Sequence, residues 1–181
     1  MNNEKLINNR SSLIVVMGVS GSGKSHMASR LSSALGFSFV EADDFHSDES
    51  KKHMADNIPI TDEVRQRWFE LVCHHLIHSA DKNIILAFSG LKNKHRQGIR
   101  SLMFNTQFIW LDGKEKIISG RLNKRRDHFV SADFLSGQLK AMEPPHLNES
   151  DVIKINIDNE IEEVFTECLQ AVFVNTNIPI Y

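Results

Sequence analysis

Short apolar runs alternate along the chain with longer segments in which apolar residues recur every three or four positions. The short runs predict buried strands, and the longer segments predict helices. The predicted strands cover residues 13–17, 37–41, 83–89, 106–111 and 152–157. The predicted helices cover residues 25–35, 62–79, 94–103, 114–124, 132–142 and 160–172.

The order of these elements predicts an α/β fold with a mainly parallel, doubly wound sheet. The strands are apolar on both faces and alternate with helices, which is typical of parallel sheets covered on two sides. The 181 residues contain no internal repeat and no low-complexity linker, so we expect a single domain over residues 1–181. Ligands of such sheets bind at the carboxyl ends of the strands.

A glycine-rich motif follows the first predicted strand and precedes the first predicted helix. It matches the phosphate-loop pattern GxxxxGK[ST] with the residues Gly18, Val19, Ser20, Gly21, Ser22, Gly23, Lys24 and Ser25. Such a loop points backbone N–H groups at phosphates, its lysine reaches the β- and γ-phosphates, and its last hydroxyl binds Mg²⁺. The motif predicts binding of ATP with Mg²⁺. The alternative is a glycine-rich turn with a chance lysine.

Acidic residues end the second predicted strand. Glu41, Asp43 and Asp44 should lie beside the phosphate loop at the ligand-binding edge of the sheet. A kinase that phosphorylates an alcohol needs a carboxylate to accept the hydroxyl proton, and further carboxylates near the metal. We expect Asp43 to act as the base and Glu41 to contribute to the metal site. A solvated acidic turn is the alternative.

A basic cluster ends the fourth predicted helix. Arg121, Lys124, Arg125 and Arg126 either complement the helix dipole or belong to a lid that closes over ATP and excludes water. Because a phosphate loop is present, the lid is the preferred interpretation. Arg125 is the expected contact of the transferred phosphoryl group, and Arg121 is the next candidate.

Charge and cysteine content exclude several classes of function. The net charge of −2 gives no basic surface for nucleic acid or for an anionic membrane. Cys73 and Cys168 lie far apart without a CxxC spacing, which fits a reducing compartment. The apolar run near the N-terminus is too short to span a bilayer. We therefore expect a cytoplasmic protein that binds small molecules.

Several ordered segments resemble the gluconate kinase family, over nearly the whole chain from about residue 13 to residue 172. The phosphate loop within MGVSGSGKS is followed by an acidic-Asp-Asp-aromatic-His segment and by four further matching groups. The residues that carry the resemblance are Ala42 to His46; Met54, Pro59, Asp62, Arg65 and Trp68; Phe88 to Lys92 with Arg96; Arg121, Leu122, Arg125, His128 and Phe129; and Gln138, Glu143, Pro144 and Pro145.

The resemblance implies a three-layer α/β/α fold like that of nucleoside monophosphate kinases, with a five-stranded sheet. It also implies a substrate-binding helical segment at about residues 44–80 and a lid at about residues 121–135. The implied reaction is phosphorylation of D-gluconate by ATP, with Asp43 meeting the hydroxyl and Arg125 neutralising phosphoryl charge. Members of the family are commonly homodimers, so we expect a homodimer.

A sugar acid needs cations for its carboxylate and polar groups for its hydroxyls. Arg65, Lys92 and Arg96 are the candidate cations, and His46 is a candidate hydroxyl ligand. The resemblance adds His128 to the substrate-binding set. The alternatives are an ion pair of Arg65 with Asp62 on its own helix and a solvated face formed by Lys92 and Arg96. For Trp68 the two interpretations are stacking on the ligand and a place in the core.

The sequence departs from the family at seven positions, several of which lie in segments that should hold the substrate. The departures are Ser47, Ser50, His53, Asn57, His95, Gln97 and Asp127. A kinase for another small acid, such as shikimate or a different aldonate, is therefore an alternative. A nucleotide-binding regulatory module without turnover is a second alternative, which Lys24, Ser25, Asp43 and Arg125 argue against.

Overall fold

The computed structural model describes residues 11–56, 58, 60–124 and 132–175. Its strands are β1 (Ser12–Met17), β2 (Ser38–Glu41), β3 (Asn83–Phe88), β4 (Asn105–Asp112) and β5 (Val152–Asn156). The helices are α2 (Lys24–Leu35), the 3-10 helix η1 (Ala42–Phe45), α3 (Asp48–Ala55), α4 (Asp62–His78), α5 (Asn93–Arg100), α6 (Glu115–Lys124), α7 (Ala132–Ala141) and α8 (Ile161–Asn175).

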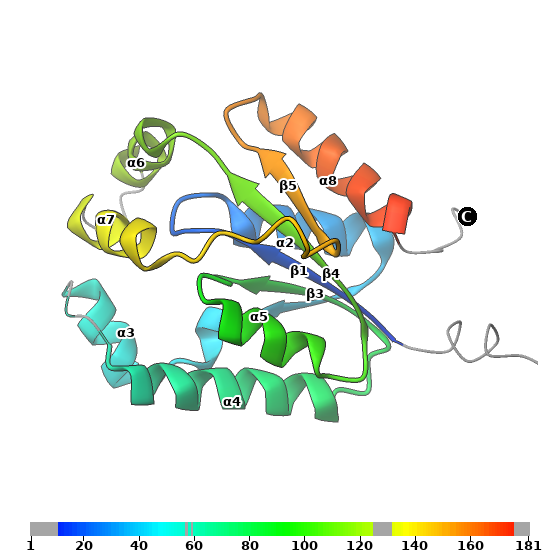
Figure 1. Ribbon diagram of the computed structural model, residues 1–181, viewed down its shortest axis with the longest axis horizontal. Helices are drawn as coiled ribbons and strands as arrows, with labels where there is room; N and C mark the ends of the chain where they lie inside the picture. Colours follow the sequence, from blue (N-terminus) through cyan, green and yellow to red (C-terminus); the bar gives the residue numbers. More distant parts are fainter. Residues whose placement is uncertain (1–10, 57, 59, 125–131, 176–181) are drawn as a thin grey trace, which may run out of the picture.

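The five strands form one sheet in the order β2-β3-β1-β4-β5, and every neighbouring pair is parallel. β1 lies at the centre, with Val16 between Ala87 of β3 and Ile109 of β4. Because all strands run in one direction, their carboxyl ends meet at one edge of the sheet. Helices α3, α6 and α7 gather at that edge (Figure 1).

Helices cover both faces of the sheet, which gives three layers. Alternate residues of β1 point to opposite faces, as the pleat requires. Ile14 and Val16 belong to a core shared with α2, α6 and α8, whereas Leu13, Val15 and Met17 pack against α4 and α5. The predicted α/β/α architecture with a parallel five-stranded sheet is confirmed.

The observed elements agree with the predicted ones to within a few residues at each end. The exceptions are η1 and α3, which lie in the predicted helical segment but had no predicted bounds. Thr61 is the N-cap of α4 and accepts a hydrogen bond from the Val64 N–H. Gly36 ends α2 in a left-handed conformation, as expected for a C-cap glycine. In the described residues, no helix combines the length and the apolar character that crossing a bilayer requires.

Candidate active site

The phosphate loop joins the central strand β1 to helix α2. Gly21 and Gly23 have φ angles of 82° and 99°, which other residues rarely adopt, and Gly23 caps α2. The Gly18 N–H donates to Ser89 O at the end of β3, which ties the start of the loop to the sheet. The loop therefore has the curled backbone that surrounds phosphates, and the N-terminus of α2 adds its positive dipole end.

Helix α6 packs closely against this loop. A Cβ added to Gly21 would come within 2.7 Å of Leu122 Cγ, so only glycine fits between the loop and α6. At Gly23 a Cβ would meet nothing within 4 Å, which leaves open space on the other side of the loop. Lys24 lies across the loop and its Nζ donates to Val19 O at 3.2 Å.

The predicted metal-site residues lie next to each other. Burial raises the pKa of the Glu41 carboxyl, while a hydrogen bond with the Ser25 side chain lowers it. The two side chains thus bring a hydroxyl and a carboxylate together beside Lys24. Oxygen donors of this kind are the ligands that Mg²⁺ prefers, so the residues fit the ion that the phosphate loop predicts.

A cavity of about 430 Å³ lies beside the loop and is lined by four of the six predicted substrate-binding residues. From the predicted set it is lined by Ser20, Lys24, Asp43, His46, Arg65 and Lys92. These residues come from the phosphate loop, η1, α4 and the start of α5. The cavity also has residues that had no predicted ligand role, including Met54, Ile60, Ser89, His95 and Gln138.

Asp43 and His46 face each other on one side of this cavity. His46 Nε2 lies 3.9 Å from Asp43 Oδ1, and the imidazole stacks on Trp68 with a centroid distance of 4.6 Å. Trp68 Nε1 donates to Ala42 O at 2.7 Å, which fixes η1 against α4. Burial lowers the pKa of His46, although Asp43 opposes the shift. Trp68 both belongs to the core and lines the cavity, so the two interpretations of this residue are compatible.

His95 is a site residue that the prediction missed. Its side chain is buried and stacks on Phe69 at 4.8 Å between ring centroids. Burial lowers the pKa of His95 to about 4, so the ring is neutral at pH 7. The only signal in the sequence was its place among the departures from the gluconate kinase family.

Lys92 lines the cavity and is paired with an acidic residue from the segment after α7. Its Nζ lies 3.1 Å from Glu143 Oε1, and Glu143 Oε2 accepts from the Asn93 N–H at 2.7 Å. Glu143 thereby holds Lys92 and caps α5 at the same time. The hydrogen bond from Asn93, followed by that from Lys92, lowers the pKa of Glu143.

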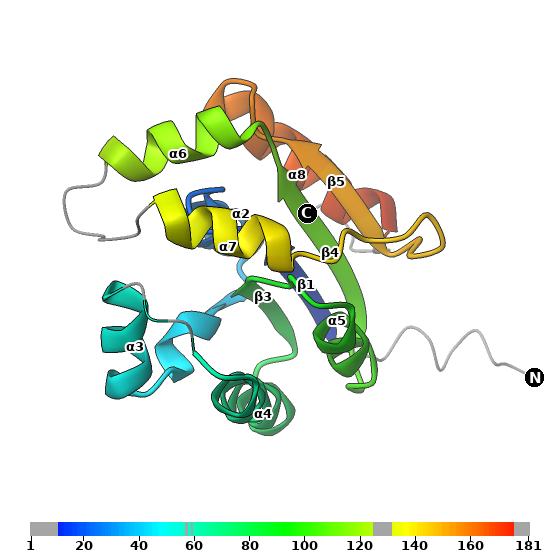
Figure 2. The ribbon, with the colours of Figure 1, turned by 60° about the vertical axis from the view of Figure 1, so that its left-hand side comes forward.

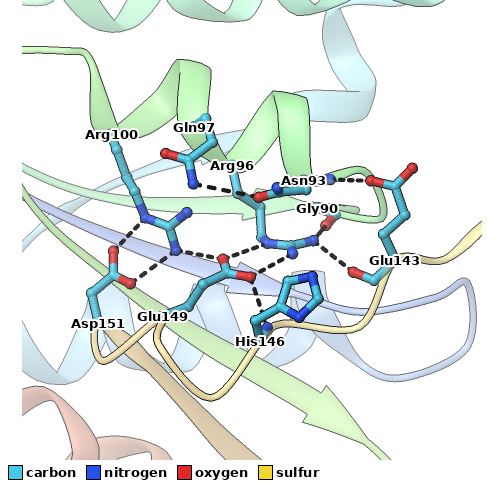
Figure 3. Close-up of polar contacts among 9 residues, drawn as sticks. All are labelled: Gly90, Asn93, Arg96, Gln97, Arg100, Glu143, His146, Glu149 and Asp151. Atoms are coloured by element: carbon cyan, nitrogen blue, oxygen red, sulfur yellow. Dashed lines mark hydrogen bonds and ion pairs between the residues drawn. The ribbon is translucent and has the colours of Figure 1, made fainter.

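Arg96 requires a correction, because it does not line the cavity. It is fully buried, and its guanidinium donates to both carboxylate oxygens of Glu149 at 2.8 and 3.0 Å. It also donates to Gly90 O and to Glu143 O (Figure 3). All of its donor nitrogens are occupied, so Arg96 connects β3 to the segment before β5 and is unavailable to a substrate carboxylate. The alternative of a solvated face is equally wrong for this residue.

The predicted lid residues lie partly outside the described part of the chain. Arg125 and His128 belong to residues 125–131, as do Arg126 and Asp127. Arg121 is described on α6, where its Nη2 donates to Ile157 O at 2.8 Å, just after β5. The described flanks of the predicted lid, α6 and α7, both lie at the carboxyl edge of the sheet (Figure 2).

Comparison with known proteins places these features in context. Residues 13–145 match the family model described as an AAA domain. The thermosensitive gluconokinase of Escherichia coli K12 is 32% identical over 160 residues, which are 87% of this chain and 86% of that protein. The crystal structure of a gluconokinase from Sinorhizobium meliloti superposes with a TM-score of 0.81 at 30% identity, covering 93% of this chain and 97% of that chain.

A shikimate kinase from Aquifex aeolicus shares the fold at lower similarity. Its TM-score is 0.55 at 20% identity, with 90% of this chain and 97% of that chain covered. The likeness extends to the fold alone, whereas the likeness to the gluconokinases includes sequence as well.

Proposed function

The chain belongs to the gluconokinase family, and from this premise we propose that it transfers the γ-phosphoryl group of ATP to D-gluconate. The products are 6-phospho-D-gluconate and ADP. The observation that supports this function best is the cavity beside the phosphate loop. It brings Lys24, the carboxylate of Asp43 and two further cations, Arg65 and Lys92, around one space.

On the donor side, the loop amides and Lys24 hold the phosphates. Ser25 and Glu41 would hold Mg²⁺, which supplies charge neutralisation on the phosphate oxygens. The raised pKa of Glu41 reflects its burial, and a neighbouring cation would favour the ionised form. Catalysis then consists of positioning and electrostatic stabilisation rather than covalent chemistry.

On the acceptor side, Asp43 accepts the proton of the gluconate hydroxyl while that oxygen attacks the γ-phosphorus. A new oxygen–phosphorus bond forms, the bond to the bridging oxygen of ADP breaks, and the proton passes to the carboxylate. His46 lies 3.9 Å from Asp43 and would orient this carboxylate or bind a substrate hydroxyl. Arg65 and Lys92 would bind the sugar-acid carboxylate, with Lys92 held in place by Glu143.

We propose that the whole chain works as one unit, with an acceptor segment at about residues 44–80 and a lid at about residues 121–135. Arg125 and His128 would reach the phosphoryl group and the substrate when the lid closes, and Arg121 would contact the nucleotide. Closure excludes water and so prevents hydrolysis of ATP.

The proposal extends to oligomeric state and location. A homodimer is proposed from the resemblance to the family, and light scattering coupled to gel filtration tests it. A cytoplasmic location is supported by two free thiols, Cys73 and Cys168.

The decisive experiment measures ADP release from Mg·ATP with a panel of acceptors. Gluconate, other aldonates and shikimate are each compared with a reaction that lacks an acceptor. We expect release to depend on gluconate. Release with a different acid would keep the kinase and replace its substrate, and binding of ATP without release on any acceptor would favour a regulatory module.

A further inference from the structure

One side chain of α7 is bonded directly to the phosphate loop. Gln138 Oε1 accepts a hydrogen bond from the Ser20 N–H at 2.7 Å, across 118 residues of sequence. Both residues line the cavity that contains Asp43 and Lys92. Neither composition nor motif spacing predicted this contact.

The position of Gln138 is fixed from the far end of its helix. The Glu143 N–H donates to Leu91 O at 2.8 Å, and Glu143 O accepts from Arg96 at 2.9 Å. The Glu143 carboxylate accepts from Asn93 and Lys92. Figure 3 shows the contacts of Glu143 with Asn93 and Arg96. Gln138 lies five residues before this anchor, on α7.

This contact uses a backbone donor, the Ser20 N–H, that a bound phosphate oxygen would also use. Backbone N–H groups of a phosphate loop bind phosphate oxygens, and the amide oxygen of Gln138 now uses the N–H of Ser20. Two acceptor oxygens facing one another repel. A glutamine resolves the conflict because its amide carries a donor NH₂ beside the acceptor oxygen, and rotation exchanges the two.

The location of Ser20 identifies which phosphate is involved. The group that is transferred has to meet the acceptor hydroxyl next to Asp43. Ser20 and Gln138 line the same cavity as Asp43, so the γ-phosphoryl group is the one that approaches them. ADP has no phosphate at that position.

We propose that Gln138 is a further catalytic residue that senses the γ-phosphoryl group. In the structure its Oε1 accepts from Ser20, and on binding of ATP its amide turns so that Nε2 donates to a γ-phosphoryl oxygen. This hydrogen bond strengthens as negative charge develops on the transferring group. It also links α7 directly to the γ-phosphoryl group of bound ATP. This inference rests on the proposed kinase function and specifies how the same site distinguishes ATP from ADP.

The variant Gln138→Glu tests the proposal, because glutamate keeps the acceptor and the shape but removes the donor and adds negative charge. We expect the Kd of a non-hydrolysable Mg·ATP analogue to rise about 10- to 100-fold, because the variant loses one hydrogen bond to a charged group. The Kd of ADP should change less than about threefold, and kcat should fall at least as much as the affinity for ATP. Calorimetric titration and ADP release provide the two readouts.

Gln170→Glu is the matched control, since it makes the same chemical change at an exposed position of α8. It should leave both nucleotide affinities and kcat unchanged. Gln138→Leu provides a second variant without added charge, for which we expect about a 10-fold loss of affinity for the ATP analogue alone. Circular dichroism verifies that each variant is folded.

The inference is overturned if Gln138→Glu and Gln138→Leu bind the ATP analogue as tightly as the wild type, or if they lose ATP and ADP affinity equally. Failure of the proposed function looks different. In that case the wild-type protein releases no ADP with gluconate, while the difference between ATP and ADP binding in the variants remains measurable.

Discussion

Asp43 and Asp44 are neighbours in the chain but lie in different surroundings. Asp43 lines the cavity and faces His46, whereas Asp44 contributes its backbone oxygen to a hydrogen bond from Lys51 and does not line the cavity. The sequence could not separate the two carboxylates, because their order along a turn does not reveal which one points to the acceptor.

Asp43→Asn should lower kcat about 10²- to 10⁴-fold, the usual contribution of a positioned proton acceptor. Its ATP affinity should stay within about threefold of wild type, because the phosphate loop is unchanged. Asp44→Asn is the control and should turn over normally. ADP release with gluconate measures both, and normal turnover of Asp43→Asn would remove Asp43 from the mechanism.

His95 makes folding stability depend on pH. Its folded-state pKa of about 4 lies below the ordinary histidine pKa of 6.5, so the unfolded chain binds a proton first as pH falls. We expect the free energy of unfolding to decrease between pH 7 and pH 5 by about 2 kcal/mol from this group. Urea unfolding of wild type and His95→Phe at both pH values measures it. An equally steep dependence in His95→Phe would assign it to other groups, of which His46 is the first candidate.

Arg96 shows what a sequence pattern cannot resolve at the scale of one residue. An arginine after a strand end is a reasonable ligand for a carboxylate, and Arg96 does bind one. That carboxylate belongs to Glu149, 53 residues away in an irregular segment, so the pairing depends on tertiary structure. The residues of the phosphate loop could be predicted because they are consecutive in the sequence and form their site without partners from distant segments.

At the scale of elements, the strands and most helices follow from their apolar periodicity. Helix α3 is the informative exception. Its eight residues bury only Ser50, so the sequence has no apolar stripe from which to predict it. Its start is set instead by Ser47, whose hydroxyl accepts from the Ser50 N–H. A capping serine alone is weak evidence for a helix when no segment of periodic apolar residues follows it.

The ion pairs between α5 and the segment before β5 should contribute strongly to stability. Glu149 is 6% exposed and accepts from Arg96, from Arg100 and from the His146 N–H. The hydrogen bond from Arg96 lowers the pKa of Glu149 to about 2. Glu149→Gln leaves a buried guanidinium without a counter-charge, and we expect a loss of about 3–5 kcal/mol in the free energy of unfolding.

Glu162→Gln is the matched control on the surface. Glu162 is 73% exposed and pairs with Arg30, so its loss should cost less than about 1 kcal/mol. Urea unfolding at pH 7 compares the two variants. Equal losses in the free energy of unfolding would show that the buried ion pairs of Glu149 stabilise the fold no more than the exposed pair of Glu162 does.

At the scale of the whole molecule, nucleotide binding should be visible as stabilisation. At a concentration of Mg·ATP about 100 times its Kd, binding adds about 2.7 kcal/mol, which corresponds to a rise in Tm of roughly 5–10 °C for a chain of this size. Differential scanning calorimetry measures the rise. Lys24→Met should abolish most of it, and a full shift in that variant would argue against phosphate binding at the loop.

Three of the candidate acceptor residues are close together in the sequence. Asp43, Arg65 and His95 all lie in the continuous stretch from the end of β2 to α5. If these residues set the acceptor preference, as the proposed function requires, then one uninterrupted stretch of gene carries them, and recombination at two points can exchange it. Such an exchange would succeed only where the recipient supplies acidic residues equivalent to Glu143 and Glu149, because Lys92 and Arg96 would otherwise arrive without their partners.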